Sequence, residues 1–306
     1  MTGYHAYHQK KDDKEFGEIN YLIQLVSILY WKKHYGKINL YCNQRFLESI
    51  KKYGLDKEYN EINTELLDNY PYEKYTERYW SFNKIYVAAD IAKKEEAFCL
   101  IDTDLWVSKP NMFREDVDVL FYHQEAVNPD FDNTVYPKVS NWLEENIISQ
   151  FDWSIAPRNS ALVIFNSNFK ELIEAWKDIS VGIIKNNFDK KFTFINKDAH
   201  TIFIEQRLIG PLAKILGVTI SEILPNTYSS IDPQWSPELG HTLESQYVAT
   251  NIKHIWGLKH RYGEIEVRKL VLEVTLSAIK EIIEDRIEYN SLIEECENYL
   301  QDIKNN

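Results

Sequence analysis

The stretch Ala97-Phe98-Cys99-Leu100-Ile101-Asp102-Thr103-Asp104 decides how this sequence folds. It opens with five apolar residues, and an apolar run of this length between polar residues predicts a buried β-strand. Two carboxylates, Asp102 and Asp104, follow at the carboxyl end of that strand. In open α/β sheets, ligands bind at this edge. The stretch therefore predicts a strand that delivers two acidic side chains to a binding site.

Two carboxylates separated by one neutral residue suit a hard divalent cation. Mg²⁺ and Mn²⁺ favour oxygen ligands, and proteins commonly hold Mg²⁺ through one or two carboxylates while substrate phosphates complete its shell. We therefore expect Asp102 and Asp104 to bind Mn²⁺ or Mg²⁺. The alternative is a solvated turn that carries two acids, because a D-x-D triplet is short and common.

Composition excludes some function classes. The chain has 306 residues, of which 44% are hydrophobic, and this is enough to bury a sizeable core. A net charge of −12 argues against a nucleic-acid binder, which would present a basic face to phosphates. A phosphate ligand would instead be held locally by a metal and a few cations.

Cysteine usage and hydropathy indicate the compartment. Cys42, Cys99 and Cys296 form no C-x-x-C pair, which fits a reducing environment and no structural zinc. Residues 1–14 contain no apolar core of a signal peptide, and no uncharged apolar run approaches eighteen residues. We expect a cytoplasmic protein without a transmembrane segment.

Strands and helices alternate along most of the chain, which implies parallel pairing and a doubly wound α/β sheet. The apolar spacing of residues 264–303, without Gly or Pro, predicts one or two further helices that pack on the main body or form a dimer contact. The expected strands are residues 3–8, 37–42, 97–101, 117–122, 160–166 and 247–255, and the expected helices are residues 19–35, 46–53, 79–92, 169–179 and 204–216.

Three further segments carry polar side chains that suit a phosphate or sugar ligand. Lys84, on the helix before the Asp102 strand, could reach a phosphate, although most such lysines face solvent. Asn159 precedes a strand and could bond hydroxyl groups. His254 could bind Mn²⁺ as a neutral imidazole or serve a structural role, and the cations of residues 259–261 could neutralise a diphosphate.

The order of these segments resembles the metal-dependent GT-A glycosyltransferases, particularly the class of glycogenin and the bacterial lipopolysaccharide galactosyltransferases. In that family a D-x-D follows a strand, an N-[ST]-[GA] turn opens a later strand, an acid-Gln pair begins a helix, and an H-x-x-G-x-x-K-P-W loop closes the nucleotide site. The matching positions here, within residues 1–262, are Asp102-Thr103-Asp104, Asn159-Ser160-Ala161, Glu205-Gln206 and His254-Ile255-Trp256-Gly257-Leu258-Lys259-His260.

A second resemblance covers the helix before the Asp102 strand. Less characterised bacterial glycosyltransferase-like proteins have a W-x-x-x-K-I helix at this place, and Trp80 to Ile85 matches it. The loop after Gly257 departs from the family pattern. Its cation Lys259 comes one position early, and His260-Arg261 replaces Lys-Pro-Trp. Any of these three residues is therefore a candidate phosphate ligand.

The resemblance implies a GT-A (Rossmann-like) doubly wound mixed sheet flanked by helices over residues 1–262, followed by a C-terminal helical extension, residues 263–306. It implies transfer of a sugar from a nucleotide-sugar donor, expected to be a UDP-sugar, to a saccharide-type or other hydroxyl acceptor in bacterial polysaccharide biosynthesis. By resemblance, the metal ligands are Asp102, Asp104 and His254, and the catalytic or sugar-orienting residues are Glu205, Asn159 and Gln206. The residues that the resemblance implies for nucleotide binding are Lys84, Asp102, Lys259, His260 and Tyr7. His5 is the alternative to Tyr7.

Two other functions stay open at this point. A catalytically degenerate protein of the same fold could bind a glycan or a partner, with the C-terminal helices as its interaction surface. A phosphohydrolase of the haloacid dehalogenase type also places Asp-x-Asp after a strand. That family, however, has Thr or Val four residues after the first Asp, where this chain has Trp106.

Overall fold

The computed structural model describes residues 1–10, 17–75, 79–110, 113–125, 150–185, 199–224, 227–228, 251–255, 264–283 and 289–305. The chain divides into two compact units, each assembled from separate stretches. Unit 1 contains Met1–Asn69, Ile101–Asn111 and Asp232–Asn306, and unit 2 contains Tyr70–Leu100 and Met112–Ile231.

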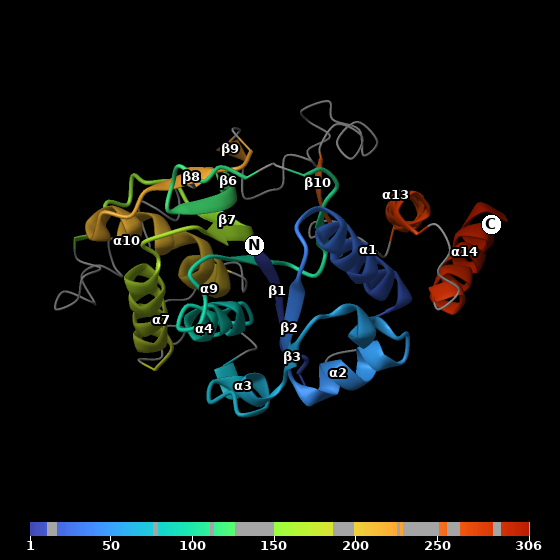
Figure 1. The fold of residues 1–306 in the computed structure, drawn as a ribbon, viewed down its shortest axis with the longest axis horizontal. Coiled ribbons are helices and arrows are strands. Elements are labelled where there is room, and N and C mark those ends of the chain that lie inside the picture. The colour runs from blue at the N-terminus through green and yellow to red at the C-terminus, as the bar shows by residue number, and fades with distance from the viewer. Residues whose placement is uncertain are drawn as a thin grey trace. The chain divides into compact units, whose positions relative to one another are not determined.

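Unit 1 contains a parallel sheet with helices between its strands (Figure 1). Strand β1 (Thr2–Tyr7) pairs in parallel with β2 (Ile38–Cys42), and β2 pairs in parallel with β3 (Ile62–Asn63). Parallel neighbours need a crossover connection, which α1 (Glu18–His34) provides between β1 and β2. The short elements that follow β2 are α2 (Gln44–Lys51), the 3-10 helix η1 (Leu55–Glu58) and α3 (Glu65–Asp68). The predicted strands at 3–8 and 37–42 and the predicted helix at 19–35 are confirmed.

Gly3 allows β1 to lie close against α1. A Cβ atom at position 3 would fall 2.5 Å from Cε2 of Trp31, which is shorter than any ordinary contact. The Trp31 ring is almost fully buried, and its Nε1 donates to the carbonyl of Lys37 at 3.0 Å. Because burial and this hydrogen bond hold the Trp31 ring in place, only glycine fits at position 3 of β1.

The C-terminal segment forms two helices, α13 (Ile265–Ile282) and α14 (Asn290–Asn305), beside α1 in unit 1 (Figure 1). Tyr30 of α1 donates its hydroxyl to Glu281 at 2.9 Å. Tyr289, just before α14, donates to Glu58 at 2.6 Å. These buried tyrosine contacts hold both helices on the body of unit 1. The domain boundary at residue 262 and the homodimer stay predictions.

Unit 2 contains a mixed sheet in the order β4-β7-β6-β8. Strand β6 pairs antiparallel with β7 and parallel with β8, and the short β9 also pairs in parallel with β6. The strands are β4 (Phe98–Ile101, of which residues 98–100 belong to unit 2), β6 (Val119–Glu125), β7 (Arg158–Phe165), β8 (Ile220–Glu222) and β9 (Thr227–Tyr228). The predicted strands at 97–101, 117–122 and 160–166 are confirmed.

Several described helices belong to unit 2. They are the 3-10 helix η2 (Glu73–Tyr75), α4 (Phe82–Ile91), α7 (Lys170–Lys185), α9 (Ala199–Ile202), the π-helical turn η4 (Phe203–Arg207) and α10 (Ile209–Leu216). The predicted helix at 204–216 is thus interrupted, because its first turn has π rather than α geometry. The predicted α/β class, a mixed sheet flanked by helices with a C-terminal helical extension, is confirmed.

One expected strand lies partly outside the described residues. Of residues 247–255, the structure describes 251–255, and within these β10 spans Ile252–His254. It pairs antiparallel with β5 (Leu105–Val107) in a separate two-stranded sheet of unit 1. Among the described helices, none has the length and apolar composition needed to cross a membrane.

Candidate functional site

The two aspartates lie in a tight turn that joins β4 to β5. The backbone N–H of Leu105 donates to the carbonyl of Asp102 at 3.1 Å, which closes the turn over Thr103 and Asp104. Asp104 is 5% exposed, and Asp102 is half-buried. The predicted D-x-D therefore stands at the end of a buried strand, and its turn holds both side chains close together.

His254 reaches this turn from far along the chain, through the pairing of β5 with β10. In that antiparallel register His254 lies opposite Leu105, the residue after Asp104. The backbone N–H of Ile255 donates to the carbonyl of Asp104 at 3.0 Å, which ties the end of β10 to the turn. The pairing of β5 with β10 thus holds the backbone beside Asp104 and the backbone beside His254 in a fixed relation.

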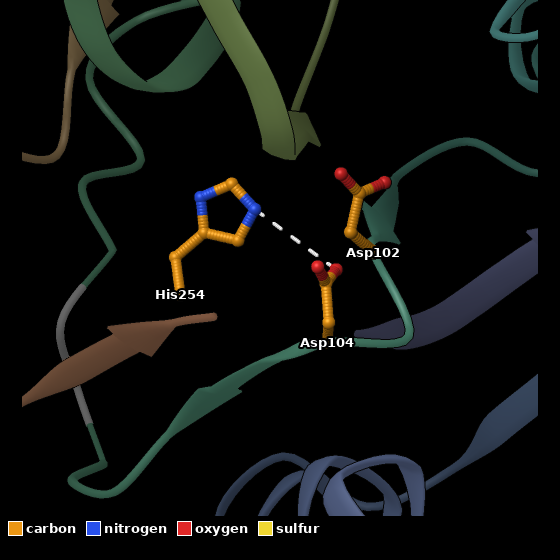
Figure 2. Close-up of side chains that lie close together, drawn as sticks. All are labelled: Asp102, Asp104 and His254. Carbon is orange, nitrogen blue, oxygen red and sulfur yellow. Dashed lines mark ion pairs between the residues drawn. The ribbon is translucent and has the colours of Figure 1, made fainter. Parts of the chain in front are cut away.

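Asp102, Asp104 and His254 can each offer one ligand atom such that all three atoms lie within 4.8 Å of one another. Nε2 of His254 lies 3.9 Å from Oδ1 of Asp104. Figure 2 shows the imidazole and both carboxylates directed toward the same space. Two carboxylate oxygens and one imidazole nitrogen are a donor set that suits Mn²⁺, and Mg²⁺ as well when phosphate oxygens complete the shell. The residues present therefore fit the predicted cation.

The cations predicted to follow this site are Lys259 and His260, with Arg261 as a third candidate, and all three lie outside the described residues. Lys253, beside His254, is described and half-buried. Burial lowers the pKa of its ammonium group to about 8. The structure therefore leaves the predicted phosphate ligands of this loop as predictions.

Unit 2 brings together two other predicted residues, Lys84 and Glu205. Nζ of Lys84, on α4, lies 2.7 Å from Oε1 of Glu205, on η4, and donates to the carbonyl of Ser160 at 3.2 Å. The hydroxyl of Ser160 also donates to Oε1 of Glu205. All three residues are at least nine-tenths buried. The contacts give Lys84 a role that the sequence did not predict, since it holds Glu205 in place. Binding of a diphosphate by Lys84 stays a prediction.

The π-helical turn presents Glu205 and Gln206 next to each other. Glu205 is buried and Gln206 is half-buried. A π-helical turn inside a helix is uncommon and is frequent at functional sites, because it changes the direction of the side chains that follow. The geometry of η4 is thus in keeping with the catalytic roles predicted for Glu205 and Gln206, which stay predictions.

Asn159 faces a glutamate that the sequence analysis missed. Nδ2 of Asn159 donates to Oε1 of Glu125 at 2.9 Å, and Oδ1 of Asn159 accepts the N–H of Ala161 at 3.0 Å. His123 lies next to this pair, with its Nε2 3.8 Å from Oε1 of Glu125. The signal was present in the sequence, since the apolar run of β6 ends in His123-Gln124-Glu125, three polar residues at the end of a strand.

The two residues considered for the nucleotide base differ in exposure. Tyr7 is half-buried, with its ring centroid 4.3 Å from that of Phe46. His5 is fully buried, and its two ring nitrogens lie 2.7 Å from the hydroxyl of Tyr59 and 3.1 Å from that of Ser27. The alternative of His5 as a base-contacting residue is therefore wrong, because both nitrogens already have partners. The role of Tyr7 stays a prediction.

Comparisons with known proteins give matches among solved structures. No protein-family model and no curated protein matches the chain. A galactosyltransferase, LgtC, in complex with donor and acceptor sugar analogues is similar over 95% of this chain and 100% of its own, with 9% identity and a TM-score of 0.43. Mouse xyloside xylosyltransferase 1 is similar over 72% of this chain and 83% of its own, with 10% identity and a TM-score of 0.38. A mannosyltransferase from S. cerevisiae is similar over 72% of this chain and 67% of its own, with 9% identity and a TM-score of 0.37.

Proposed function

We propose that this protein is a metal-dependent glycosyltransferase of the GT-A class, which transfers a sugar from a nucleotide-sugar donor to a hydroxyl group of a saccharide-type acceptor. The observation that carries the proposal is the convergence of Asp102, Asp104 and His254, whose ligand atoms lie within 4.8 Å of one another. The chain supplies these residues in the order of the family motifs that it resembles. A UDP-sugar is the proposed donor.

Asp102, Asp104 and His254 would hold the divalent cation. Such a cation stabilises the negative charge that develops on the departing nucleoside diphosphate, as a Lewis acid. The two carboxylates would balance part of the charge of the ion, and the neutral imidazole would add a ligand without adding charge. Three protein ligands would leave the shell to be completed by phosphate oxygens of the donor, so binding of metal and nucleotide should depend on each other.

Glu205, Asn159 and Gln206 are the proposed sugar-orienting and catalytic residues. Glu205 is held by the ammonium group of Lys84 and the hydroxyl of Ser160, and Asn159 is held by Glu125. Because these partners fix each side chain in one orientation, the groups are arranged before any substrate arrives. Glu205 is proposed to bond the donor sugar or the acceptor hydroxyl, and it is the first candidate for a general base in an inverting reaction.

Thermal unfolding in the presence of UDP and Mn²⁺ tests the proposal. A ligand that binds only the folded state stabilises it by about 2.7 kcal/mol at 100 times its Kd. We therefore expect UDP with Mn²⁺ to raise the Tm by several degrees, and UDP alone to raise it much less. Asp104→Asn should abolish the Mn²⁺-dependent part, because the amide has lost the ligand charge.

Asp116→Asn is the matched control, since it makes the same change at an exposed carboxylate paired with Arg114 in unit 2. It should keep the full response to Mn²⁺ and UDP. An unchanged melting curve of the wild-type protein at millimolar UDP and Mn²⁺ would overturn the proposal.

A screen of nucleotide sugars for slow hydrolysis to the free nucleotide identifies the donor without knowledge of the acceptor. The expected result is Mn²⁺-dependent release of UDP from one or a few UDP-sugars. In Glu205→Gln this release should be lost or strongly reduced. Binding of UDP without hydrolysis or transfer of any sugar would support the degenerate, glycan-binding alternative. Release of phosphate from simple phosphomonoesters would support a phosphohydrolase.

A further inference from the structure

A line of buried hydrogen bonds runs from α1 of unit 1 to the turn that carries the aspartates. Nε2 of Gln24 donates to the hydroxyl of Tyr59 at 2.7 Å, and that hydroxyl lies 2.7 Å from Nδ1 of His5. Nε2 of His5 lies 3.1 Å from the hydroxyl of Ser27, which donates to the carbonyl of Leu105 at 2.5 Å. We name these four side chains and the Leu105 carbonyl the His5 network.

The direction of every bond in the His5 network follows from its last member. A carbonyl oxygen only accepts, so the Ser27 hydroxyl must donate its proton to Leu105. The Ser27 oxygen then accepts from His5, which places the imidazole proton on Nε2. His5 Nδ1 therefore accepts from the hydroxyl of Tyr59, whose oxygen in turn accepts from Gln24. The network has one consistent arrangement of protons and one tautomer of His5.

The residues of the His5 network come from separate elements and lie away from solvent. His5 is on β1, Gln24 and Ser27 are on α1, and Tyr59 follows η1. His5 and Gln24 are fully buried, Ser27 is 1% exposed, and Tyr59 is 7% exposed. A buried polar group that loses its partner destabilises the folded state, so the hydrogen bonds that join these side chains hold them in one geometry.

Leu105, where the His5 network ends, is the residue on which the geometry of the candidate metal site depends. Its N–H closes the turn onto the carbonyl of Asp102. Its neighbour Asp104 supplies the second carboxylate, and His254 lies directly opposite it on β10. The carbonyl of Asp104 bonds to the residue that follows β10, and the carbonyl of Leu105 bonds to Ser27 of α1. A shift of Leu105 would move all three candidate ligands.

We propose that Ser27, His5 and Tyr59 are positioning residues of the metal site, which set the spacing of Asp102, Asp104 and His254 by anchoring the carbonyl of Leu105. The proposal rests on the proposed function, since it assigns these residues to the same cation site. They touch neither the cation nor the substrate. Their effect on metal binding passes through the backbone of Leu105.

Ser27→Ala tests the last link of the His5 network, and Mn²⁺ affinity measured by isothermal titration calorimetry is the readout. Substitution of residues that orient metal ligands typically weakens metal affinity about 10- to 100-fold. We expect Ser27→Ala to raise the Kd for Mn²⁺ by about tenfold or more. The electron paramagnetic resonance spectrum of bound Mn²⁺ should also change, because the ligand geometry differs.

Ser180→Ala is the matched control. Ser180 is also fully buried, and its hydroxyl donates to a backbone carbonyl, that of Trp176, at 2.8 Å in α7 of unit 2. Both variants lose a buried hydroxyl-to-carbonyl bond, so both should be somewhat less stable to urea. Only Ser27→Ala should alter the Kd for Mn²⁺ and the spectrum.

Tyr59→Phe tests the network at a distance from Leu105 and keeps the ring that packs in the core. The substitution removes the hydroxyl and leaves Nδ1 of His5 without its hydrogen-bond donor, while Ser27 and Leu105 still place the imidazole proton on Nε2. Nitrogen-15 NMR of the imidazole should therefore show the Nε2–H tautomer in both proteins, with a changed Nδ1 chemical shift in Tyr59→Phe. The Kd for Mn²⁺ should rise, by less than in Ser27→Ala.

The outcomes separate the two proposals. If the wild-type protein does not bind Mn²⁺, the proposed function fails and the positioning role fails with it. If the wild-type protein binds Mn²⁺ and Ser27→Ala binds it as tightly as Ser180→Ala does, only the positioning role is wrong. An Nδ1–H tautomer of His5 in the wild-type protein would also overturn the positioning role.

Discussion

Leu105 lies directly opposite His254 in the antiparallel pairing of β5 with β10. Successive residues of a strand point to opposite faces, so a slip of one residue in this register would turn the imidazole away from Asp104. The backbone bond from Ile255 to Asp104 holds the register at this end of the pairing. Placement of the imidazole is therefore a property of the ladder and does not depend on His254 alone.

Removal of the imidazole should weaken metal binding while the fold persists. His254→Ala removes one of the three proposed ligands, and we expect the Kd for Mn²⁺ to rise by about tenfold or more. His34→Ala is the control, because it removes another histidine of unit 1, one that contacts the carbonyl of Ser108 in this structure. Calorimetric titration with Mn²⁺ provides the measurement. Equal Kd values for the two variants would show that His254 is not a ligand.

The buried pair of Lys84 and Glu205 should contribute strongly to stability. Lys84→Met leaves the carboxylate of Glu205 buried without its cation, and loss of one partner of a buried pair typically lowers the free energy of unfolding by about 3–5 kcal/mol. Lys94→Met makes the same change in the exposed pair with Asp90 and should cost less than about 1 kcal/mol. Urea unfolding measures both.

A second substitution distinguishes loss of the ion pair from loss of packing. In Lys84→Met with Glu205→Gln, no uncompensated charge stays buried, so part of the lost stability should return. If the double variant is as unstable as the sum of the two single variants, the pair is not coupled.

Asp118 should stabilise unit 2 in a manner that depends on pH. Burial disfavours its charged form, but hydrogen bonds from Ser167, Thr219 and Asn168 outweigh burial and lower the pKa of the carboxyl to about 2. A carboxyl whose pKa is lower in the folded state contributes stability above its unfolded pKa, near 4, and loses it as the pH falls toward 2.

Asp118→Asn should accordingly lower the free energy of unfolding by about 1–2 kcal/mol at pH 7. The difference from wild type should shrink between pH 4 and pH 2. Urea unfolding at pH 7 and at pH 3 provides the comparison. A difference that stays constant over this range would contradict the role of the charge.

His5 should make unit 1 less stable in mild acid. Burial lowers the pKa of its imidazole to about 3, although the charge of Asp104 opposes the shift. The unfolded chain binds a proton at His5 below about pH 6.5 and the folded chain does not, so stability is fully present above pH 6.5 and decreases as the pH falls toward 3.

Between pH 7 and pH 5 this histidine alone should cost about 1–2 kcal/mol. His5→Gln is less stable at pH 7, because it disrupts the His5 network, but it should lose less further stability on acidification. The measurement is the free energy of unfolding in urea at the two pH values. Identical losses in the variant and the wild type would contradict the assignment.

The sequence predicted the acidic turn well, because local signals determine it. The apolar run before Asp102 requires a buried strand, and the strand carries both acids to its end. The helix at 19–35 was equally clear, since its apolar spacing continues for several turns. His254 was predicted from the order of motifs, and the structure brings it to Asp104 through the β5–β10 pairing.

Contacts between distant residues could not be predicted in the same way. β5 is only Leu105–Val107, too short for a periodic signal, so its pairing with β10 was missed. The ion pair of Lys84 with Glu205 joins positions 121 residues apart, and nothing local to either residue specifies the other. The π-helical turn at Phe203–Arg207 was missed because the same residues also fit an α-helix.

The division of the chain also determines when the proposed cation site can form during biosynthesis. Asp102 and Asp104 leave the ribosome early, whereas His254 follows the whole of unit 2, which ends at Ile231. Unit 2 can therefore fold on the nascent polypeptide while unit 1 still lacks β10. A translation product that stops between residues 112 and 231 carries both aspartates but not His254, so the proposed site for the cation is incomplete in it.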